Sequence, residues 1–318
     1  MRPITYFIFF ISGLLYAQDS FTPGEVFYEQ ERYDEARQAF LDHLTQDPDH
    51  QKSREYLGDI ACLDKDWDTA LKYYEPLVEE TPGSANYHFK YGGTLGMKAL
   101  EVNKMRALGY ISSIKYHLRR AAELDPRHVE VRWALVEFYI QLPGIIGGSE
   151  KTAIKYADQL LEFSPVDGHL CHGYIAEYSD RPKDAEYHYK KAISVGGSEL
   201  TYDKLINFYE NNDRPEAAIE KAGESKRIHK RNRLNYQIGK IAAQYNVNSE
   251  LGIECLKSYI ANHSAKDGVP VDWAYFRLAQ IYKNLGDKGQ ALQWIDKALA
   301  DRPDFEEAMK EKQIILSL

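Results

Sequence analysis

The feature that most constrains this chain is a pattern of bulky apolar, small and turn-forming residues that recurs along it. The pattern is clearest in residues 275–303, which end on a proline. The mixture of aromatic and charged residues in the chain suits stacked amphipathic helices. The marking residues are Tyr275, Leu278, Ala279, Tyr282, Gly286, Ala291, Ile295, Ala298 and Pro303.

These marks resemble the tetratricopeptide repeat (TPR), whose template is W-x2-L-G-x2-Y…A-x3-F…P. Tyr275 stands in place of Trp, Ala279 in place of Gly, and Ile295 in place of Phe. The resemblance implies pairs of antiparallel helices that stack on their neighbours. We therefore predict an all-α fold, a right-handed α-solenoid superhelix of about eight TPR helix pairs with a C-terminal capping helix.

Related marks recur through most of the chain. They predict a secretory signal peptide at 1–17, a TPR solenoid at 18–305 and a capping helix at 306–318. The third and fourth repeats are longer than the template. We expect longer helices or an extra turn across 93–113, and a long turn at 142–149. The repeats are predicted at 18–50, 51–84, 85–128, 129–165, 166–198, 199–231, 232–267 and 272–305.

The first seventeen residues have a different composition from the rest. Arg2 precedes an apolar run at 4–16, and Ala17 offers a small residue for cleavage. A basic start, a short apolar segment and a small residue are typical of a secretory signal peptide. We therefore expect export to a bacterial periplasm or cell envelope, with cleavage after Ala17. An uncleaved membrane anchor and peripheral association with the envelope are left open.

The charge balance disfavours some classes of partner. The formal net charge is −8, and an acidic chain is a poor general binder of nucleic acid. The basic cluster at 225–233 fits a helix end and a solvated face, so we predict no nucleic-acid partner. Cys62, Cys171 and Cys255 fall in different repeats, and we expect three buried thiols.

The segment 143–152 is rich in glycine and ends in Lys-Thr. It is not a phosphate-binding loop, because Glu150 stands where that motif requires glycine. Ser149 is expected to cap the next helix, whose first turn contains Glu150. Contact with a ligand or anion is the alternative. The candidate ligand loop consists of Gly144, Gly147, Gly148 and Ser149.

His169, Cys171 and His172 form an H-x-C-H sequence, and two His three apart share a helix face. Metal binding would need further ligands such as His117, His128 or His188 to converge by folding. We prefer the reading of ordinary surface or groove residues. No metal, cofactor or catalytic residue is predicted.

In the TPR family, the first helix of each pair lines a groove, and its residues between the packing marks contact the partner. Transferring this by position gives a set rich in Tyr and Trp, which are common at interface hot spots. The set is Tyr28, Tyr56, Phe89, Trp133, Glu137, Tyr174, Tyr178, Asn207, Tyr236, Lys240, Trp273, Phe276, Arg277 and Lys283.

The predicted groove also changes the sign of its charge from one end to the other. Acidic residues at 25, 29, 55 and 59 lie toward one end, and Lys240, Arg277 and Lys283 lie toward the other. Such an arrangement would orient a partner of opposite polarity.

We therefore predict a non-catalytic scaffold that binds a protein or peptide, with the partner unidentified. The alternative is a small-molecule-binding TPR protein with a pocket formed by the 93–113 and 142–149 insertions. An open trough would favour a peptide and an enclosed cavity a small ligand. A third class, an enzyme using His169 and His172 with a metal, has little support.

Overall fold

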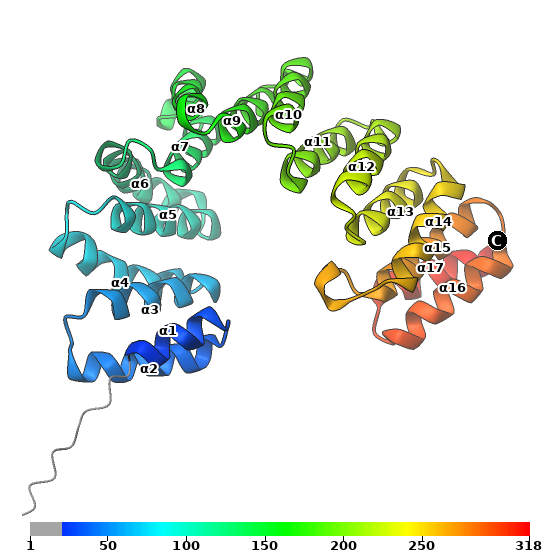
Figure 1. The fold of residues 1–318 in the computed structure, drawn as a ribbon, viewed down its shortest axis with the longest axis horizontal. Coiled ribbons are helices and arrows are strands. Elements are labelled where there is room, and N and C mark those ends of the chain that lie inside the picture. Colours follow the sequence, from blue (N-terminus) through cyan, green and yellow to red (C-terminus); the bar gives the residue numbers. More distant parts are fainter. Residues whose placement is uncertain (1–20) are drawn as a thin grey trace, which may run out of the picture. The chain divides into compact units, whose positions relative to one another are not determined.

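The computed structural model describes residues 21–318, and the predicted signal peptide at 1–17 lies outside them. The described residues form seventeen α-helices and two short 3-10 helices, with no strand (Figure 1). The predicted all-α fold is thereby confirmed. The chain divides into two compact units, residues 1–135 and 136–318.

The N-terminal unit is a row of antiparallel helices in which each helix packs against the next along the chain. Its helix α7 (Val129–Gln141) continues into the second unit. The helices before α7 are α1 (Phe21–Glu29), α2 (Tyr33–Gln46), α3 (Gln51–Leu63), α4 (Trp67–Glu80), α5 (Ala85–Glu101) and α6 (Lys104–Leu124).

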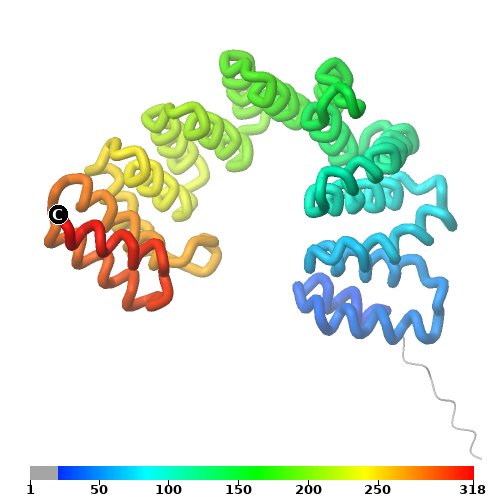
Figure 2. Tube along the Cα trace, turned by 180° about the vertical axis from the view of Figure 1, so that it is seen from behind, coloured from blue at the N-terminus to red at the C-terminus, as the bar shows by residue number. Residues whose placement is uncertain are grey.

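The C-terminal unit continues the same arrangement and ends on α17, which packs against α16 and α15 (Figure 2). Two 3-10 helices, η1 (Gly144–Ile146) and η2 (Ala265–Asp267), lie in its longer connections. Its α-helices are α8 (Glu150–Phe163), α9 (Pro165–Tyr178), α10 (Pro182–Gly196), α11 (Glu199–Asn211), α12 (Pro215–His229), α13 (Arg233–Tyr245), α14 (Ser249–Ala261), α15 (Val271–Asn284), α16 (Lys288–Asp301) and α17 (Glu306–Ser317).

A tight turn with one left-handed residue joins the helices of many pairs. Lys65 (φ 59°), Asp180 (φ 54°) and Asp213 (φ 51°) occupy this position, and Gly286 (φ 75°) occupies it in the last pair. In each case the next amide bonds the carbonyl five residues back, as in Asp66 N to Ala61 O at 2.9 Å. This bond satisfies carbonyls at the helix end and reverses the chain.

Small residues let the two helices of a pair approach closely. A Cβ atom on Gly58 would lie 2.4 Å from the ring of Tyr74, and one on Gly173 would lie 2.5 Å from the ring of Tyr189. Both rings are almost fully buried, as are Ala70 and Ala185 one turn earlier. The recurrent glycine and Ala-x3-aromatic marks are therefore two sides of one contact, which explains their constant spacing.

The two insertions have different structures. In the third repeat, α5 has 17 residues and α6 has 21, joined at Val102 and Asn103. Longer helices therefore account for the 93–113 insertion, and Leu108–Tyr110 is helical. In the fourth repeat, residues 142–149 form a loop around η1.

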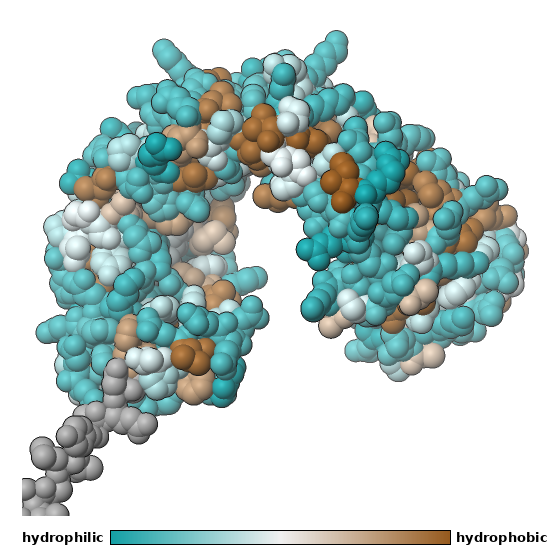
Figure 3. All heavy atoms as spheres, in the orientation of Figure 1, coloured by the Kyte–Doolittle hydropathy of each residue, from teal (hydrophilic) through white to brown (hydrophobic). Residues whose placement is uncertain are grey.

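The first sixteen described α-helices form eight successive pairs, and α17 follows them at Glu306–Ser317. No described helix is both long and apolar enough to cross a membrane. In the view of Figure 3, hydrophilic side chains cover most of the surface and apolar side chains show as separate patches.

Candidate functional site

A hollow of about 350 Å³ lies on α9 and α11 in the C-terminal unit. Three predicted groove residues, Tyr174, Tyr178 and Asn207, line it together. Tyr178 is 54% exposed, and Asn207 is also exposed. We call this the α9–α11 hollow. Its other lining residues are Glu177, Tyr189, Lys204, Phe208 and Asn211.

Hydrogen bonds hold the wall of the α9–α11 hollow in place. Glu177 accepts one from Tyr189 Oη at 2.8 Å and one from Asn211 Nδ2 at 3.1 Å. It thereby links α9 to α10 and α11. Gln141 Nε2 donates to Tyr174 Oη at 2.8 Å. Phe208 and Tyr189 are buried beneath these groups, so the hollow has an apolar floor and a polar rim.

The rim has unusual electrostatics for a surface site. Burial raises the pKa of Glu137, and the nearby Lys204 ammonium opposes this rise. Burial also raises the pKa of Tyr174, and the hydrogen bond from Gln141 opposes it. Glu137, another predicted groove residue, therefore lies within electrostatic range of the hollow. The surface presents an acid, an amine, carboxamides and phenols.

The remaining predicted groove residues of this unit are more involved in packing. Phe276 is 5% exposed and lies in a core with Phe305, so we leave it out of the proposed groove. Trp273 packs against the same core, 4.6 Å from the Phe305 ring. The Arg277 guanidinium lies 5.6 Å from the Trp273 ring. Tyr236 contacts the ring of Tyr259 at 5.4 Å.

Two of the three basic residues predicted at one end of the groove form local ion pairs. Lys240 Nζ lies 3.1 Å from a carboxylate oxygen of Glu210, and Lys283 Nζ lies 2.7 Å from Glu311. Each lysine is thus neutralised by a neighbouring helix. Local ion pairs therefore use two of the three charges on which the predicted polarity depended, whereas Arg277 lies over the rings of Trp273 and Phe276.

In the N-terminal unit, three of the predicted aromatic groove residues pack against other rings of the same unit. The ring of Tyr28 lies 4.9 Å from that of Tyr56, which stacks on buried Phe40 at 4.7 Å. Phe89 contacts the ring of His128 at 5.1 Å, and Trp133 is half-buried. Burial and the nearby Asp59 carboxylate raise the pKa of Tyr28 to about 12.

The charges on α3 and α5 form a closed cluster. Lys90 Nζ lies 2.7 Å from Glu55 Oε1 and 2.6 Å from Asp59 Oδ2. Burial tends to raise the pKa of Glu55, but hydrogen bonds from Lys52 and Lys90 hold it below its ordinary value. Two of the predicted acidic groove residues therefore already have a lysine partner.

The candidate ligand loop packs closely against its own backbone and caps α8. The side chain of Ser149 accepts a hydrogen bond from Thr152 N at 3.2 Å, which confirms its predicted role as helix cap. A Cβ atom on Gly148 would lie 1.7 Å from the Leu142 carbonyl oxygen, and Gly147 has φ 108°. Gly144 begins η1. Gly147 and Gly148 are therefore required by the backbone of the loop.

The H-x-C-H sequence acquires a third histidine through folding. His188 on α10 lies with its Nδ1 3.3 Å from Nδ1 of His169, and its ring stacks on His172 at 4.8 Å. Burial lowers the pKa of His188 to about 4, with a further contribution from His172 and His169. Cys171 is fully buried and its pKa is raised by burial. The group is a packed histidine cluster.

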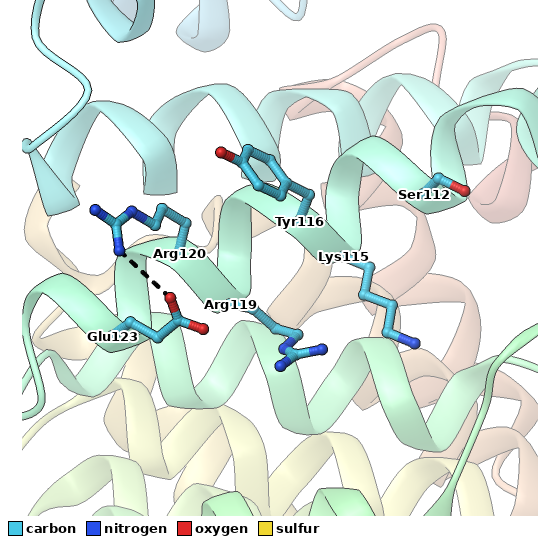
Figure 4. A pocket seen from close by; sticks show the side chains of 6 residues that line it. All are labelled: Ser112, Lys115, Tyr116, Arg119, Arg120 and Glu123. Atoms are coloured by element: carbon cyan, nitrogen blue, oxygen red, sulfur yellow. Dashed lines mark hydrogen bonds and ion pairs between the residues drawn. The ribbon is translucent and has the colours of Figure 1, made fainter.

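A second hollow, of about 370 Å³, follows one face of α6 (Figure 4). It presents three basic side chains, Lys115, Arg119 and Arg120, and the last pairs with Glu123 at 3.5 Å. By contrast, the predicted basic cluster at 225–233 is partly neutralised, since Arg233 bonds Glu199 and Asp203 at 2.8 and 2.7 Å.

Sequence reasoning missed Lys204 and Asn211, which line the α9–α11 hollow with Asn207. A signal was present, because residues three and four apart on a helix share its face. It also missed the α6 face, where Lys115, Arg119 and Glu123 recur every four residues. The decisive information, which neighbouring side chains cover each face, is tertiary.

Comparisons with known proteins agree with the helical pairs. A family profile described as tetratricopeptide repeat matches residues 23–85, and a second matches residues 274–310. A solved tetratricopeptide repeat protein from Parabacteroides merdae ATCC 43184 superposes with a TM-score of 0.51. It is 13% identical, and the match covers 93% of this chain and 97% of that chain. This likeness shows the fold.

Two curated human proteins are similar in sequence. The antiviral innate immune response effector IFIT1 of Homo sapiens is 26% identical over 158 residues, which is 44% of this chain and 32% of the relative. The protein O-mannosyl-transferase TMTC3 of Homo sapiens is 22% identical over 291 residues, which is 87% of this chain and 31% of the relative. The chain spans about a third of the length of each. Taken with the helix pairs, the profile matches show that this chain contains tetratricopeptide repeats and folds as an α-helical repeat protein.

Proposed function

We propose that the chain is a non-catalytic scaffold that binds an extended segment of a partner protein across the α9–α11 hollow. The observation that supports this most is the convergence of Tyr174, Tyr178 and Asn207 from two successive first helices on one hollow. Helical-repeat proteins commonly use such surfaces for binding.

The chemistry of the rim suits a peptide backbone. The carboxamide of Asn207 offers two donors and an acceptor, and that of Asn211, which already donates to Glu177, offers one donor and an acceptor. These groups match the N–H and C=O groups of an extended segment. Tyr174 and Tyr178 offer apolar area with a polar tip, a combination enriched at interfaces. Lys204 and Glu137 would then select the charge of partner side chains.

We further propose that the protein works in a bacterial periplasm or cell envelope. Support comes from Arg2, the apolar run at 4–16 and Ala17, which together match a signal peptide. Intact mass of protein recovered from the envelope fraction of a bacterial host tests this. A mass corresponding to a chain that begins at Gln18 supports the proposal, and a full-length mass contradicts it.

Binding is tested by selecting peptides from an unbiased display library on the wild-type chain. Affinities of the selected peptides are then measured for an Asn207→Ala, Asn211→Ala double variant. We expect at least a tenfold loss, because hot-spot truncations cost more than about 1.4 kcal/mol. Selected peptides that bind the double variant as tightly as the wild type would contradict the proposed site.

Neither insertion, taken by itself, supports the alternative that the chain binds a small molecule. Residues 93–113 are mostly helix, and the 142–149 loop packs on its own backbone. Native mass spectrometry of the purified chain distinguishes the two functions. A stoichiometric bound small molecule would favour the alternative over the scaffold.

A further inference from the structure

The connection between α2 and α3 brings two histidines and an aspartate together on the surface. One nitrogen of His43, one carboxylate oxygen of Asp47 and one nitrogen of His50 all lie within 4.8 Å of one another. Within residues 21–318, this is the one group of three His, Cys, Asp or Glu side chains whose possible metal-binding atoms lie this close together. It lies outside the proposed peptide site and needs a separate explanation.

Local structure accounts for the convergence. His43 is in the last turn of α2, and Asp47, four residues later, is its C-cap, so the two side chains share one side of the helix end. Pro48 then stops the helix. His50 N donates to Asp47 O at 3.2 Å, which folds the chain back. The rings of His43 and His50 meet edge-to-face at 4.5 Å.

Neighbouring residues hold this geometry. Arg54 donates to Pro48 O at 2.7 Å and to the Asp49 carboxylate at 2.8 Å, which braces the connection. Nδ1 of His50 lies 2.9 Å from Oγ of buried Ser53. Nδ1 also accepts a hydrogen bond from Ser53 N at 3.2 Å, so His50 caps α3 and its ring is held in place.

We propose that His43, Asp47 and His50 bind a first-row transition-metal cation of the Zn²⁺ type. Two imidazoles and one carboxylate are a donor set that such cations prefer. Bonds of about 2.1 Å in a tetrahedron place donors about 3.4 Å apart, so small side-chain rotations close the observed spacing. Asp47 is exposed and both histidines are half-buried, so an ion can enter from solvent. Bound metal ties the end of α2 to the start of α3, joining the first two helix pairs.

The chain contains a natural comparison for this site. Residues 125–128 repeat the same Asp-Pro-x-His sequence between α6 and α7. There the position four residues before the aspartate is Ala121 instead of histidine, and the Asp125 carboxylate accepts from Arg127 N at 2.9 Å. His128 pairs with Glu130 at 3.0 Å. The second connection therefore lacks the donor set although its sequence is similar.

The test uses the tag-free full chain, stripped with chelator and titrated with Co²⁺, whose visible absorption reports bound nitrogen donors. Variants are His43→Gln, His50→Asn, which keeps a capping side chain, and Asp47→Asn on the exposed surface. The matched control is His128→Gln. The measured quantity is the number of equivalents of Co²⁺ that each variant loses relative to the wild type. Co²⁺ bound at other places on the chain therefore does not affect the comparison.

We expect the wild type and His128→Gln to bind one equivalent that His43→Gln and His50→Asn lose, and Asp47→Asn to weaken binding at least tenfold. The melting temperature of the wild type should rise with Co²⁺, and that of His43→Gln should not. Undiminished binding in both histidine variants, or no absorption change in the wild type, would overturn the proposal. If a histidine variant loses helicity, Asp47→Asn decides the outcome, and unchanged binding there rejects the site.

Discussion

The first helices of the helix pairs carry similar side chains in the two units, but these side chains are used in opposite ways. On α3 and α5, Lys90 is bound between Glu55 and Asp59, and the three charges satisfy one another. On α9 and α11, exposed Lys204, Asn207 and Asn211 surround a hollow. Equivalent positions in a repeat are therefore either part of the packing or available to a partner, and the neighbouring helix decides which.

Removing Lys90 should reveal the largest difference in stability between the two regions. Lys90→Met leaves Asp59 without its lysine partner and leaves Glu55 with only Lys52 and Asn86, and breaking a partly buried ion pair costs about 3 kcal/mol. Lys204→Met, at the exposed position, should change stability by no more than about 0.5 kcal/mol. Urea unfolding followed by circular dichroism measures both. Equal effects would show that the α3–α5 cluster is no more structural than the rim of the hollow.

Both units should depend equally on the close contact between a glycine of the first helix and a tyrosine of the second helix of a pair. Gly58→Ala and Gly173→Ala each force a methyl group against a buried tyrosine ring, which we expect to cost about 2 kcal/mol. Gly93→Ala in α5 is the control, since a Cβ there meets nothing within 4 Å. It should stabilise the helix by up to about 1 kcal/mol. Thermal unfolding of the three variants tests the ranking, and a stabilised Gly58→Ala would contradict it.

Each unit also contains a half-buried histidine that should respond to pH. Burial lowers the pKa of His117 to about 4, with His88 adding repulsion, and His188 has a similar value. The unfolded chain, with a pKa near 6.5 for each group, takes up protons first as the pH falls. Stability is therefore full above about pH 6.5, declines below it, and stops declining near pH 4.

Urea midpoints measured across this pH range check the expectation. His117→Gln and His188→Gln should each flatten the curve, because each removes one group whose protonation opposes folding. A curve that keeps its slope in both variants would mean that other groups cause the dependence.

The fold could be predicted because its signals are local. The glycine of the first helix and the Ala-x3-aromatic mark of the second describe one contact, as Gly58 with Tyr74 and Gly173 with Tyr189 show. Turn and cap positions such as Ser149 are likewise set by a few consecutive residues. Such patterns reveal helix pairs and their packing faces without knowledge of the neighbours.

The site could be predicted only in part, because exposure depends on residues distant in sequence. Tyr178 and Phe276 are both aromatic residues on first helices, yet one is 54% exposed and the other 5%. The difference arises because Phe305, after α16, packs 5.3 Å from the Phe276 ring. In the same way, Glu210 and Glu311 neutralise lysines that the sequence alone presented as a basic end.

The central claim, that the α9–α11 hollow binds a peptide, is tested most directly by two matched tyrosines. Tyr178 lines the hollow and is 54% exposed, whereas Tyr187 on α10 is outside its lining and is 56% exposed. The measurement is the Kd of a library-selected peptide for Tyr178→Ala and for Tyr187→Ala. We predict that Tyr178→Ala weakens binding at least tenfold while Tyr187→Ala leaves it unchanged. Equal losses in the two variants, or a loss only in Tyr187→Ala, would contradict the account.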